Sequence, residues 1–286
     1  MTDVAVLLPA YNEEVSVASM VILSSKYAKE VIVIDDGSAD RTSEVAKLAG
    51  ATVLRHSTNR GKGVALKTGF DYAKDFDIIV TIDADGQHNP SEIPLLIKPI
   101  EDGVADIVNG SRYLYGHETS TPKFRRVGQT VLDTATNMAS GIKLTDSQSG
   151  FRAFSSKSID CFNFDPEGFG IESDMLIEAS NNNLRITEVE VSVRYDVNTT
   201  TDNPFVQGMS ALLRIFELMR FNRPIYFYGV GGAIILFFGI LIYLTISNSV
   251  YSTNIYLSAV GIFVVLMGVV IILSGVLTDY LNRFKH

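Results

Sequence analysis

A long uncharged stretch near the C-terminus limits most strongly how this chain can fold. Residues 224–278 include no Asp, Glu, Lys, Arg or His. Within them, two apolar runs at about 226–246 and 255–277 are separated by a polar segment, 247–254. Roughly 20 helical residues span the hydrocarbon core of a bilayer, so each run is long enough to cross it. We therefore expect a transmembrane α-helical hairpin; the alternative is a hairpin buried in a soluble core.

Basic residues flank the two apolar runs. Arg214, Arg220 and Arg223 precede the first run, and Arg283 and Lys285 follow the second. The segment between the runs carries no charge. Because Lys and Arg concentrate on the cytoplasmic side of membrane proteins, this pattern predicts an integral membrane protein with both termini, and the whole N-terminal region, in the cytoplasm.

Composition narrows the choice of partners. The chain has 286 residues, enough for one sizeable domain and a smaller appendage. Its formal net charge of -8 argues against nucleic acid as a partner, and binding of anionic ligands would require a metal ion or locally placed Arg and Lys. The single cysteine, Cys161, excludes an internal disulfide, and we expect no secretion signal at the start of the chain.

Short apolar runs alternate with helix-like segments in the N-terminal region. The strand-like runs are 4–8, 31–34, 52–55, 78–82 and 107–108. The helix-like segments between them are 15–23, 42–48, 64–73 and 90–97. This alternation predicts an α/β fold with a mostly parallel sheet and helices on both faces.

The strand-like run 78–82 stops in two carboxylates, Asp83 and Asp85. Side chains at i and i+2 of an extended segment point the same way, so these two carboxylates could bind one ligand together. Carboxylates held close repel each other unless a cation lies between them, and Gln87 and His88 would add ligands that suit Mg2+ or Mn2+. The alternative is a polar loop after a strand.

Other polar residues also follow strand-like runs. They are Glu13, Asp36 and Arg112. In open α/β sheets, ligands bind beyond the carboxyl ends of the strands. We therefore expect these three residues to converge with the two carboxylates on one crevice.

Five short motifs follow one another along the chain. They are PAYNEE at 9–14, DDGS at 35–38, NRGKG at 59–63, DADGQ at 83–87 and GSR at 110–112. Their order and spacing resemble the family 2 glycosyltransferases of GT-A (Rossmann-like) fold, over residues 1–195. Within that family the chain looks most like the polyprenyl-phosphate glycosyltransferases, which include dolichol-phosphate mannose synthase and bacterial polyprenyl-phosphate glucosyltransferases. The resemblance implies transfer of one sugar from a UDP- or GDP-linked donor to dolichyl or undecaprenyl phosphate.

The resemblance also implies a donor site. Its nucleoside-binding residues would be Pro9, Tyr11, Glu13, Ile34 and Asp36. Asp83, Asp85 and Gln87, with Ala84 among them, would hold Mg2+ or Mn2+ on the diphosphate and so stabilise the leaving group, Asp85 being catalytic. Lys62 would add positive charge near the phosphates; a solvated lysine on a loop is the alternative reading.

Several cations are candidates for binding the acceptor phosphate. They are Arg112, which is also assigned a catalytic role, and the pair Arg125 and Arg126. Arginine binds phosphate oxygens bidentately, and Gln129 or Thr130, one turn later on a helix predicted over 123–138, could donate as well. The alternative for the arginine pair is a basic helix face resting on lipid head groups.

The segment DSQSGFR at 146–152 resembles the family's Asp-x-x-Ser-Gly-Phe segment, which lies near the sugar and the acceptor. Asp146 could orient the sugar or serve as a catalytic base, and Ser149 is implied as a binding residue. A base is dispensable, because a phosphate monoester has a second pKa near 6 and brings its own nucleophile. We therefore expect one in-line displacement with inversion, driven by positioning.

After Tyr195 the chain departs from the pattern, since DVNTTTDNP at 196–204 replaces an Arg and a Gly-x-Ser-Lys loop. Arg194 is the nearest cation and is a candidate binding residue, and if the family's loop closes over the diphosphate, this chain must use a different lid. The expected organisation is a catalytic domain at 1–204, an interfacial amphipathic helix at 205–223 and the membrane hairpin at 224–286. Related two-span enzymes form homo-oligomers, which makes a second copy a possible partner.

Two other functions fit parts of the sequence. A processive polysaccharide or glycolipid synthase would need the family's Gln-x-x-Arg-Trp motif, and the chain contains no Trp. A non-catalytic membrane scaffold that binds nucleotide sugars would not need the intact set of Asp83, Asp85 and Gln87. The sequence therefore favours the transferase.

Overall fold

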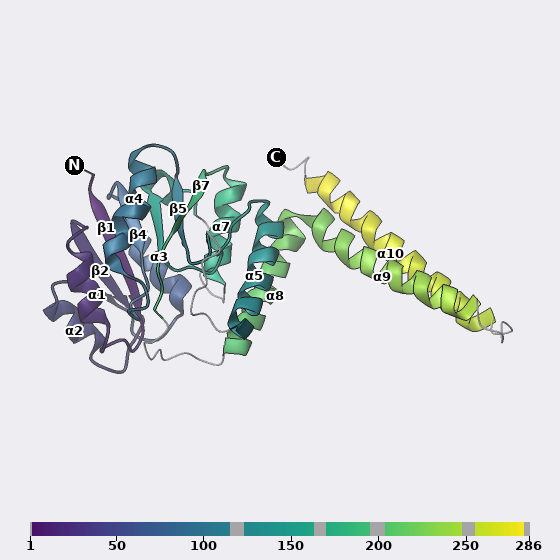
Figure 1. Cartoon of the computed structure of the whole chain (residues 1–286), viewed down its shortest axis with the longest axis horizontal. Helices are drawn as coiled ribbons and strands as arrows, with labels where there is room; N and C mark the ends of the chain where they lie inside the picture. The colour runs from purple at the N-terminus through teal and green to yellow at the C-terminus, as the bar shows by residue number, and fades with distance from the viewer. Residues whose placement is uncertain (1, 115–122, 163–169, 195–203, 248–254, 283–286) are drawn as a thin grey trace. The chain divides into compact units, whose positions relative to one another are not determined.

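The computed structural model describes residues 2–114, 123–162, 170–194, 204–247 and 255–282 (Figure 1). The chain divides into two compact units, residues 1–215 and 216–286. Their boundary falls inside one helix, α8 (Pro204–Asn222). The division at residues 204 and 223 expected from the sequence stays a prediction.

A seven-stranded sheet forms the centre of the first unit. Its strands are β1 (Val4–Ala10), β2 (Glu30–Asp35), β3 (Thr52–Arg55), β4 (Ile78–Thr81), β5 (Ile107–Ser111), β6 (Arg152–Ser155) and β7 (Ile186–Glu190). They lie in the order β3-β2-β1-β4-β6-β5-β7, and only the two pairings made by β6 are antiparallel. The predicted α/β fold with a mostly parallel sheet is confirmed. β6 is absent from the predicted strands because its four residues, RAFS, carry no clear strand pattern.

Helices cover both faces of this sheet (Figure 1). They are α1 (Val17–Ser24), α2 (Thr42–Leu48), α3 (Lys62–Ala73), α4 (Ile93–Glu101) after the short turn η1 (Pro90–Glu92), α5 (Lys123–Ser140), α6 (Ser156–Ile159) and α7 (Ile171–Asn181). Successive residues of β1 point to opposite faces: Val6 and Leu8 pack in a core with α1, α2 and α4, and Leu7 packs in a core with α3 and α7. The central strands of the sheet are thus buried on both faces, and the polar residues that could bind a ligand lie at their ends.

The antiparallel strand β6 brings a distant segment to the carboxyl end of β4. Thr81, the last residue of β4, pairs with Arg152, the first residue of β6. Because β6 runs against β4, the segment that leads into it, 146–151, lies beside the end of β4. The Thr81 hydroxyl fixes this segment by donating to the carbonyl oxygen of Gly150 at 3.0 Å.

The second unit contains helices α9 (Pro224–Ser247) and α10 (Ile255–Asn282). Both are long and apolar enough to cross a membrane, and large side chains such as Phe237 and Phe263 are mostly exposed. Glycines allow the two helices to approach closely, because a Cβ at Gly232 or Gly268 would overlap the backbone of the opposite helix. The two predicted apolar helices are confirmed.

Candidate active site

Three carboxylates lie together beyond the carboxyl ends of β1 and β4. Glu13 follows β1, and Asp83 and Asp85 follow β4. Burial raises the pKa of Asp85 to about 6, and the neighbouring charge of Asp83 adds to this effect. Burial also raises the pKa of Glu13, with further contributions from Asp85 and Asp83. The predicted convergence of these residues therefore has an electrostatic consequence: they repel one another.

One lysine partly offsets this repulsion. The Lys62 ammonium, at the first residue of α3, lies 2.6 Å from Asp83 Oδ1 and 2.8 Å from Glu172 Oε1. Burial would lower the pKa of Lys62, but the charges of Asp83 and Glu172 raise it above its ordinary value. Burial would likewise raise the pKa of Asp83, but Lys62 holds it below its ordinary value. Glu13, Lys62, Asp83, Asp85 and Glu172 are called the Asp83 cluster below.

A close contact with the backbone fixes the Asp83 carboxylate. A Cβ placed on Gly150 would lie 2.7 Å from Asp83 Cγ, well inside van der Waals contact. A residue without a side chain is therefore required at position 150. This contact explains why the segment before β6 and the carboxylates after β4 form one site.

The donor set of the cluster suits a hard divalent cation that is shared with a ligand. Among the residues that the structure describes, no group of three or more His, Cys, Asp or Glu side chains is placed to hold a metal ion alone. Mg2+ is commonly held by one or two carboxylates together with substrate phosphates, and Asp83 and Asp85 provide such a pair. The Asp85 carboxylate is oriented by the backbone N–H of Gln87, which donates to Oδ1 at 3.0 Å. The residues present thus fit a metal that a phosphate ligand completes.

His88, the other suggested ligand, is buried against Phe151, with ring centroids 5.3 Å apart. Burial lowers its pKa to about 4, so the imidazole is neutral at physiological pH. Its Nδ1 atom has no hydrogen-bond partner within the described part of the chain. His88 is therefore a buried, neutral imidazole that packs on Phe151.

The residues assigned to the nucleoside lie at the ends of β1 and β2. Pro9 pairs with Ile34 across the two strands, and the Ile34 side chain is fully buried in the core. Tyr11 is 44% exposed beyond β1. The Asp36 carboxylate accepts hydrogen bonds from His56 Nδ1 at 2.7 Å and from two backbone N–H groups of the NRGKG loop. Asp36 therefore braces that loop, and Ile34 can offer a ligand only its backbone.

The other residues predicted to bind the donor are Ala84, Ser149 and Arg194, which lie near the Asp83 cluster in the fold. Ala84 lies between Asp83 and Asp85 in the sequence. Its side chain is buried in the hydrophobic core and therefore serves packing. Ser149 is also buried, and its hydroxyl accepts from the Phe151 N–H at 3.3 Å. Arg194 is exposed, and its backbone N–H donates to the Gln87 carbonyl at 2.9 Å, which places the chain after β7 next to the metal-binding segment.

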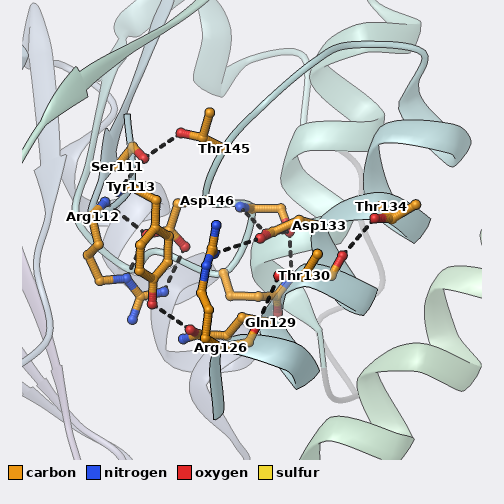
Figure 2. A network of polar contacts seen from close by, with 12 residues as sticks. Ser111, Arg112, Tyr113, Arg126, Gln129, Thr130, Asp133, Thr134, Thr145 and Asp146 are labelled. Carbon is orange, nitrogen blue, oxygen red and sulfur yellow. Dashed lines mark hydrogen bonds and ion pairs between the residues drawn. The ribbon is translucent and has the colours of Figure 1, made fainter. Parts of the chain in front are cut away.

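A second group of charged residues lies around Arg112 (Figure 2). The guanidinium of Arg112 binds Asp146 through two parallel contacts of 2.6 Å, from Nε to Oδ2 and from Nη2 to Oδ1. Asp146 is fully buried, and both of its carboxylate oxygens are engaged in this pair. Glu188, on β7, accepts hydrogen bonds from the backbone N–H groups of Thr145 and Asp146 and so holds this segment in place.

Helix α5 contributes the other half of this group (Figure 2). The Arg126 guanidinium stacks on the Tyr113 ring, 3.6 Å from its centroid, and lies 3.6 Å from Asp133 Oδ2. Tyr113 donates its hydroxyl hydrogen to Gln129 Oε1 at 2.5 Å. The predicted helix over 123–138 is confirmed as α5, whereas the Arg125 side chain lies outside the described residues. Arg112, Tyr113, Arg126, Gln129, Asp133 and Asp146 are called the Arg112 network below.

Arg152 connects the two groups and was not among the predicted site residues. Its guanidinium is fully buried and donates to Asn109 Oδ1 at 2.9 Å, to the Ser147 carbonyl at 2.8 Å and to the Glu172 carbonyl at 2.7 Å. Burial lowers the pKa of Arg152 to about 10. Asp133, also missed, accepts from the Ser147 N–H and hydroxyl, and burial raises its pKa to about 6. The only signal for Arg152 in the sequence was its place at the end of the DSQSGFR segment.

Residues 5–162 match the family model described as glycosyl transferase family 2, over more than half of the chain. The chain belongs to glycosyl transferase family 2. The predicted family and its GT-A fold are thereby confirmed.

Relatives and solved structures agree with this family. An uncharacterised protein of Methanocaldococcus jannaschii is 37% identical over 220 residues, covering 74% of this chain and 90% of the relative. The UDP-N-acetylglucosamine–dolichyl-phosphate N-acetylglucosaminyltransferase of Methanococcus voltae is 34% identical over 212 residues, covering 66% of this chain and 84% of the relative. Glucosyl-3-phosphoglycerate synthase of Mycobacterium tuberculosis, solved with Mn2+, uridine-diphosphate-glucose and phosphoglyceric acid, matches with a TM-score of 0.61 at 23% identity, over 76% of this chain and 79% of that one. The last similarity shows the fold of this family 2 glycosyltransferase.

Proposed function

We propose that the protein transfers a single sugar from a nucleotide sugar to a polyprenyl phosphate, with inversion at the anomeric carbon. The observation that carries the proposal is the Asp83 cluster, in which carboxylates outnumber the single ammonium and lie at the ligand-binding end of the sheet. A divalent cation that binds together with a donor diphosphate would supply the missing positive charge. The relative from Methanococcus voltae is named for a UDP-sugar donor and a dolichyl-phosphate acceptor, which supports the same substrate classes here.

On the donor side, Asp83 and Asp85 would hold Mg2+ or Mn2+ against the diphosphate. When bound, the cation would neutralise charge that builds on the departing nucleoside diphosphate. The residues of the chain would orient the donor. The backbone N–H of Gln87 holds the Asp85 carboxylate in position for this role. Tyr11 and Glu13, beyond β1, would contact the nucleoside.

On the acceptor side, Arg112 and Arg126 would bind the phosphate. Arg112 is fixed by its bidentate pair with Asp146, and Arg126 by Tyr113. A phosphate monoester is mostly dianionic at neutral pH, so it can attack without a protein base. Because both oxygens of Asp146 are engaged by Arg112, we assign Asp146 the role of positioning this arginine rather than that of removing a proton.

The two apolar helices would anchor the enzyme in a membrane, with its catalytic unit and both termini on the cytoplasmic face. Exposed apolar residues of α8, such as Met209 and Leu213, would lie in the interface beside the cation Arg220. A lipid acceptor explains both features, since its phosphate sits at the bilayer surface. A homo-oligomer would be compatible with this arrangement.

The decisive experiment is a transfer assay with the full-length chain in nanodiscs. UDP- and GDP-sugars are screened with polyprenyl phosphate, in Mn2+ or Mg2+ and in EDTA, and with 3-phosphoglycerate as a soluble control acceptor. We expect metal-dependent formation of polyprenyl-phosphate sugar that falls by about a thousandfold or more in Asp85→Asn. Asp75→Asn is the matched control, because Asp75 is exposed and precedes β4 at the opposite end of the sheet.

Several results would contradict the proposal. Transfer in EDTA, or full activity in Asp85→Asn, would eliminate the metal mechanism. Sugar transfer to 3-phosphoglycerate alone would replace the lipid acceptor with a soluble one. Nucleotide-sugar binding without turnover on any acceptor would favour the non-catalytic scaffold, and formation of a polymer would favour the polysaccharide synthase.

A further inference from the structure

The Lys62 ammonium occupies one of the two carboxylate oxygens of Asp83, which is also a candidate metal ligand. The ammonium lies 2.6 Å from Asp83 Oδ1, and the backbone of Gly150 closes another side of the same carboxylate. A divalent cation that binds Asp83 through Oδ1 would therefore have to take the place of Lys62. The side chains of Lys62 and Asp83 are each about one-third exposed, at 33% and 30%, so solvent and ligands can reach the pair.

Glu172 gives the displaced lysine a place to remain. Its Oε1 atom lies 2.8 Å from the Lys62 ammonium, so one ammonium is shared between two carboxylates. The fold fixes Glu172 independently, because the buried guanidinium of Arg152 binds its backbone carbonyl at 2.7 Å. Lys62 can thus leave Asp83 without losing every charged partner, which keeps the cost of its displacement low.

We propose that Lys62 is a built-in competitor of the divalent cation for Asp83, released toward Glu172 and the donor diphosphate when metal and donor bind together. The inference rests on the proposed function, since it requires a metal and a nucleotide sugar at this site. It gives Lys62 a specific task that neither a solvated lysine nor a permanent phosphate ligand would have.

Two consequences follow. The donor-free enzyme binds the cation weakly, because the cation must displace the Lys62 ammonium from Asp83 Oδ1. The donor then strengthens cation binding twice, by adding phosphate ligands and by offering Lys62 a new anionic partner. By linkage, the cation strengthens donor binding by the same factor.

The test measures Mn2+ affinity by electron paramagnetic resonance of free Mn2+, with the full-length chain in nanodiscs of uncharged lipid, first with no nucleotide. Lys62→Gln removes the competing charge, and we expect it to bind Mn2+ roughly tenfold more tightly than the wild type, within the usual range of coupling between sites. Lys62→Arg keeps the charge and should resemble the wild type. Lys67→Gln, which changes an exposed lysine of the same helix, is the matched control.

A double variant separates competition from simple loss of positive charge. Lys62→Gln with Glu172→Gln restores the net charge of the wild-type cluster but leaves no ammonium on Asp83. Competition predicts that the double variant still binds donor-free Mn2+ about tenfold more tightly than the wild type. The double variant also leaves no uncompensated Glu172 carboxylate, so it keeps the test available if Lys62→Gln alone does not fold.

Addition of UDP or GDP distinguishes failure of this inference from failure of the proposed function. Mn2+ binding that depends on nucleotide and on Asp85, but is unchanged in Lys62→Gln, would overturn the competition and leave the proposed function standing. A double variant with wild-type affinity would also overturn it. If no Asp85-dependent Mn2+ binding occurs with either nucleotide, both the competition and the metal-dependent function are wrong.

Discussion

The Asp83 cluster and the Arg112 network are both made of charged residues at one end of the same sheet, yet their charges are balanced differently. In the network, each arginine has a carboxylate of its own: Arg112 pairs with Asp146, and Arg126 faces Asp133. In the cluster, one ammonium serves several carboxylates, and the pKa of Asp85 is raised to about 6 by burial and by Asp83. Each arginine of the network is therefore matched by a carboxylate within the protein, whereas the carboxylates of the cluster outnumber its ammonium and leave a place for a cation. Substitutions should separate them, because changes in the network should lower stability as well as acceptor binding, and changes in the cluster should mainly lower activity.

The largest effect on stability is expected from Asp146→Ala. This substitution leaves the Arg112 guanidinium, whose side chain is only 10% exposed, without its bidentate partner. Removing one member of a buried ion pair costs about 3–5 kcal/mol of unfolding free energy. Chemical unfolding followed by circular dichroism measures this loss.

A pair of similar geometry whose guanidinium is exposed provides the control. Arg185 also makes two contacts of 3.0 Å to a carboxylate, that of Asp106, but its side chain is 57% exposed. Arg185→Ala should cost less stability than Asp146→Ala, because water screens the exposed guanidinium. Equal losses for the two variants would show that burial of the guanidinium does not distinguish the network from a pair with an exposed arginine.

Gly150→Ala should damage the cluster while sparing the network. The added methyl group would overlap the Asp83 carboxylate and push it from its position. Because a displacement of about 1 Å at a catalytic site can cost a factor of 100, we expect sugar transfer to fall by about a hundredfold. Initial rates under saturating donor and acceptor measure the effect.

Gly128→Ala is the matched control for that substitution, since a Cβ at Gly128, on α5, meets nothing within 4 Å. It should leave transfer close to the wild-type rate. A Gly150→Ala enzyme of normal activity would mean that Asp83 tolerates relocation, and the close backbone contact would then have no catalytic role.

Features that depend on local patterns were predictable from the sequence. The apolar run before Asp83 identified β4, and the rule that parallel strands present ligands at their carboxyl ends brought Glu13, Asp83 and Asp85 together. Helix α2 has the same limits as its prediction, 42–48, because Gly50 ends the periodic pattern.

Features that depend on contacts between distant segments were not predictable. Lys62 and Glu172 come from α3 and α7, and only the folded sheet brings them within 2.8 Å. The four residues of β6 are too few to show a period, so the antiparallel pairing that places Gly150 against Asp83 had no local signal. Asp146 was identified by its motif, but its two contacts with Arg112, which favour positioning over base catalysis, are tertiary.

The smallest effect is a gain in stability, and it tests the incomplete charge balance of the cluster directly. In EDTA, Asp85→Asn removes a repelled carboxylate but keeps an oxygen that can accept from the Gln87 N–H. Asp85 has a pKa of about 6 in the folded protein against 3.8 ordinarily, so between these values the native state binds more protons than the unfolded state and stability falls as pH rises. The loss of stability caused by the ionised Asp85 carboxylate is therefore fully present above pH 6 and absent below pH 4. Since Asp85 is partly exposed, we expect Asp85→Asn to be about 1 kcal/mol more stable than the wild type at pH 7.5, with no difference near pH 4. Unfolding measured at both pH values checks this sign; a loss of stability at pH 7.5 would mean that the metal-free cluster is already balanced and does not need a cation to complete it.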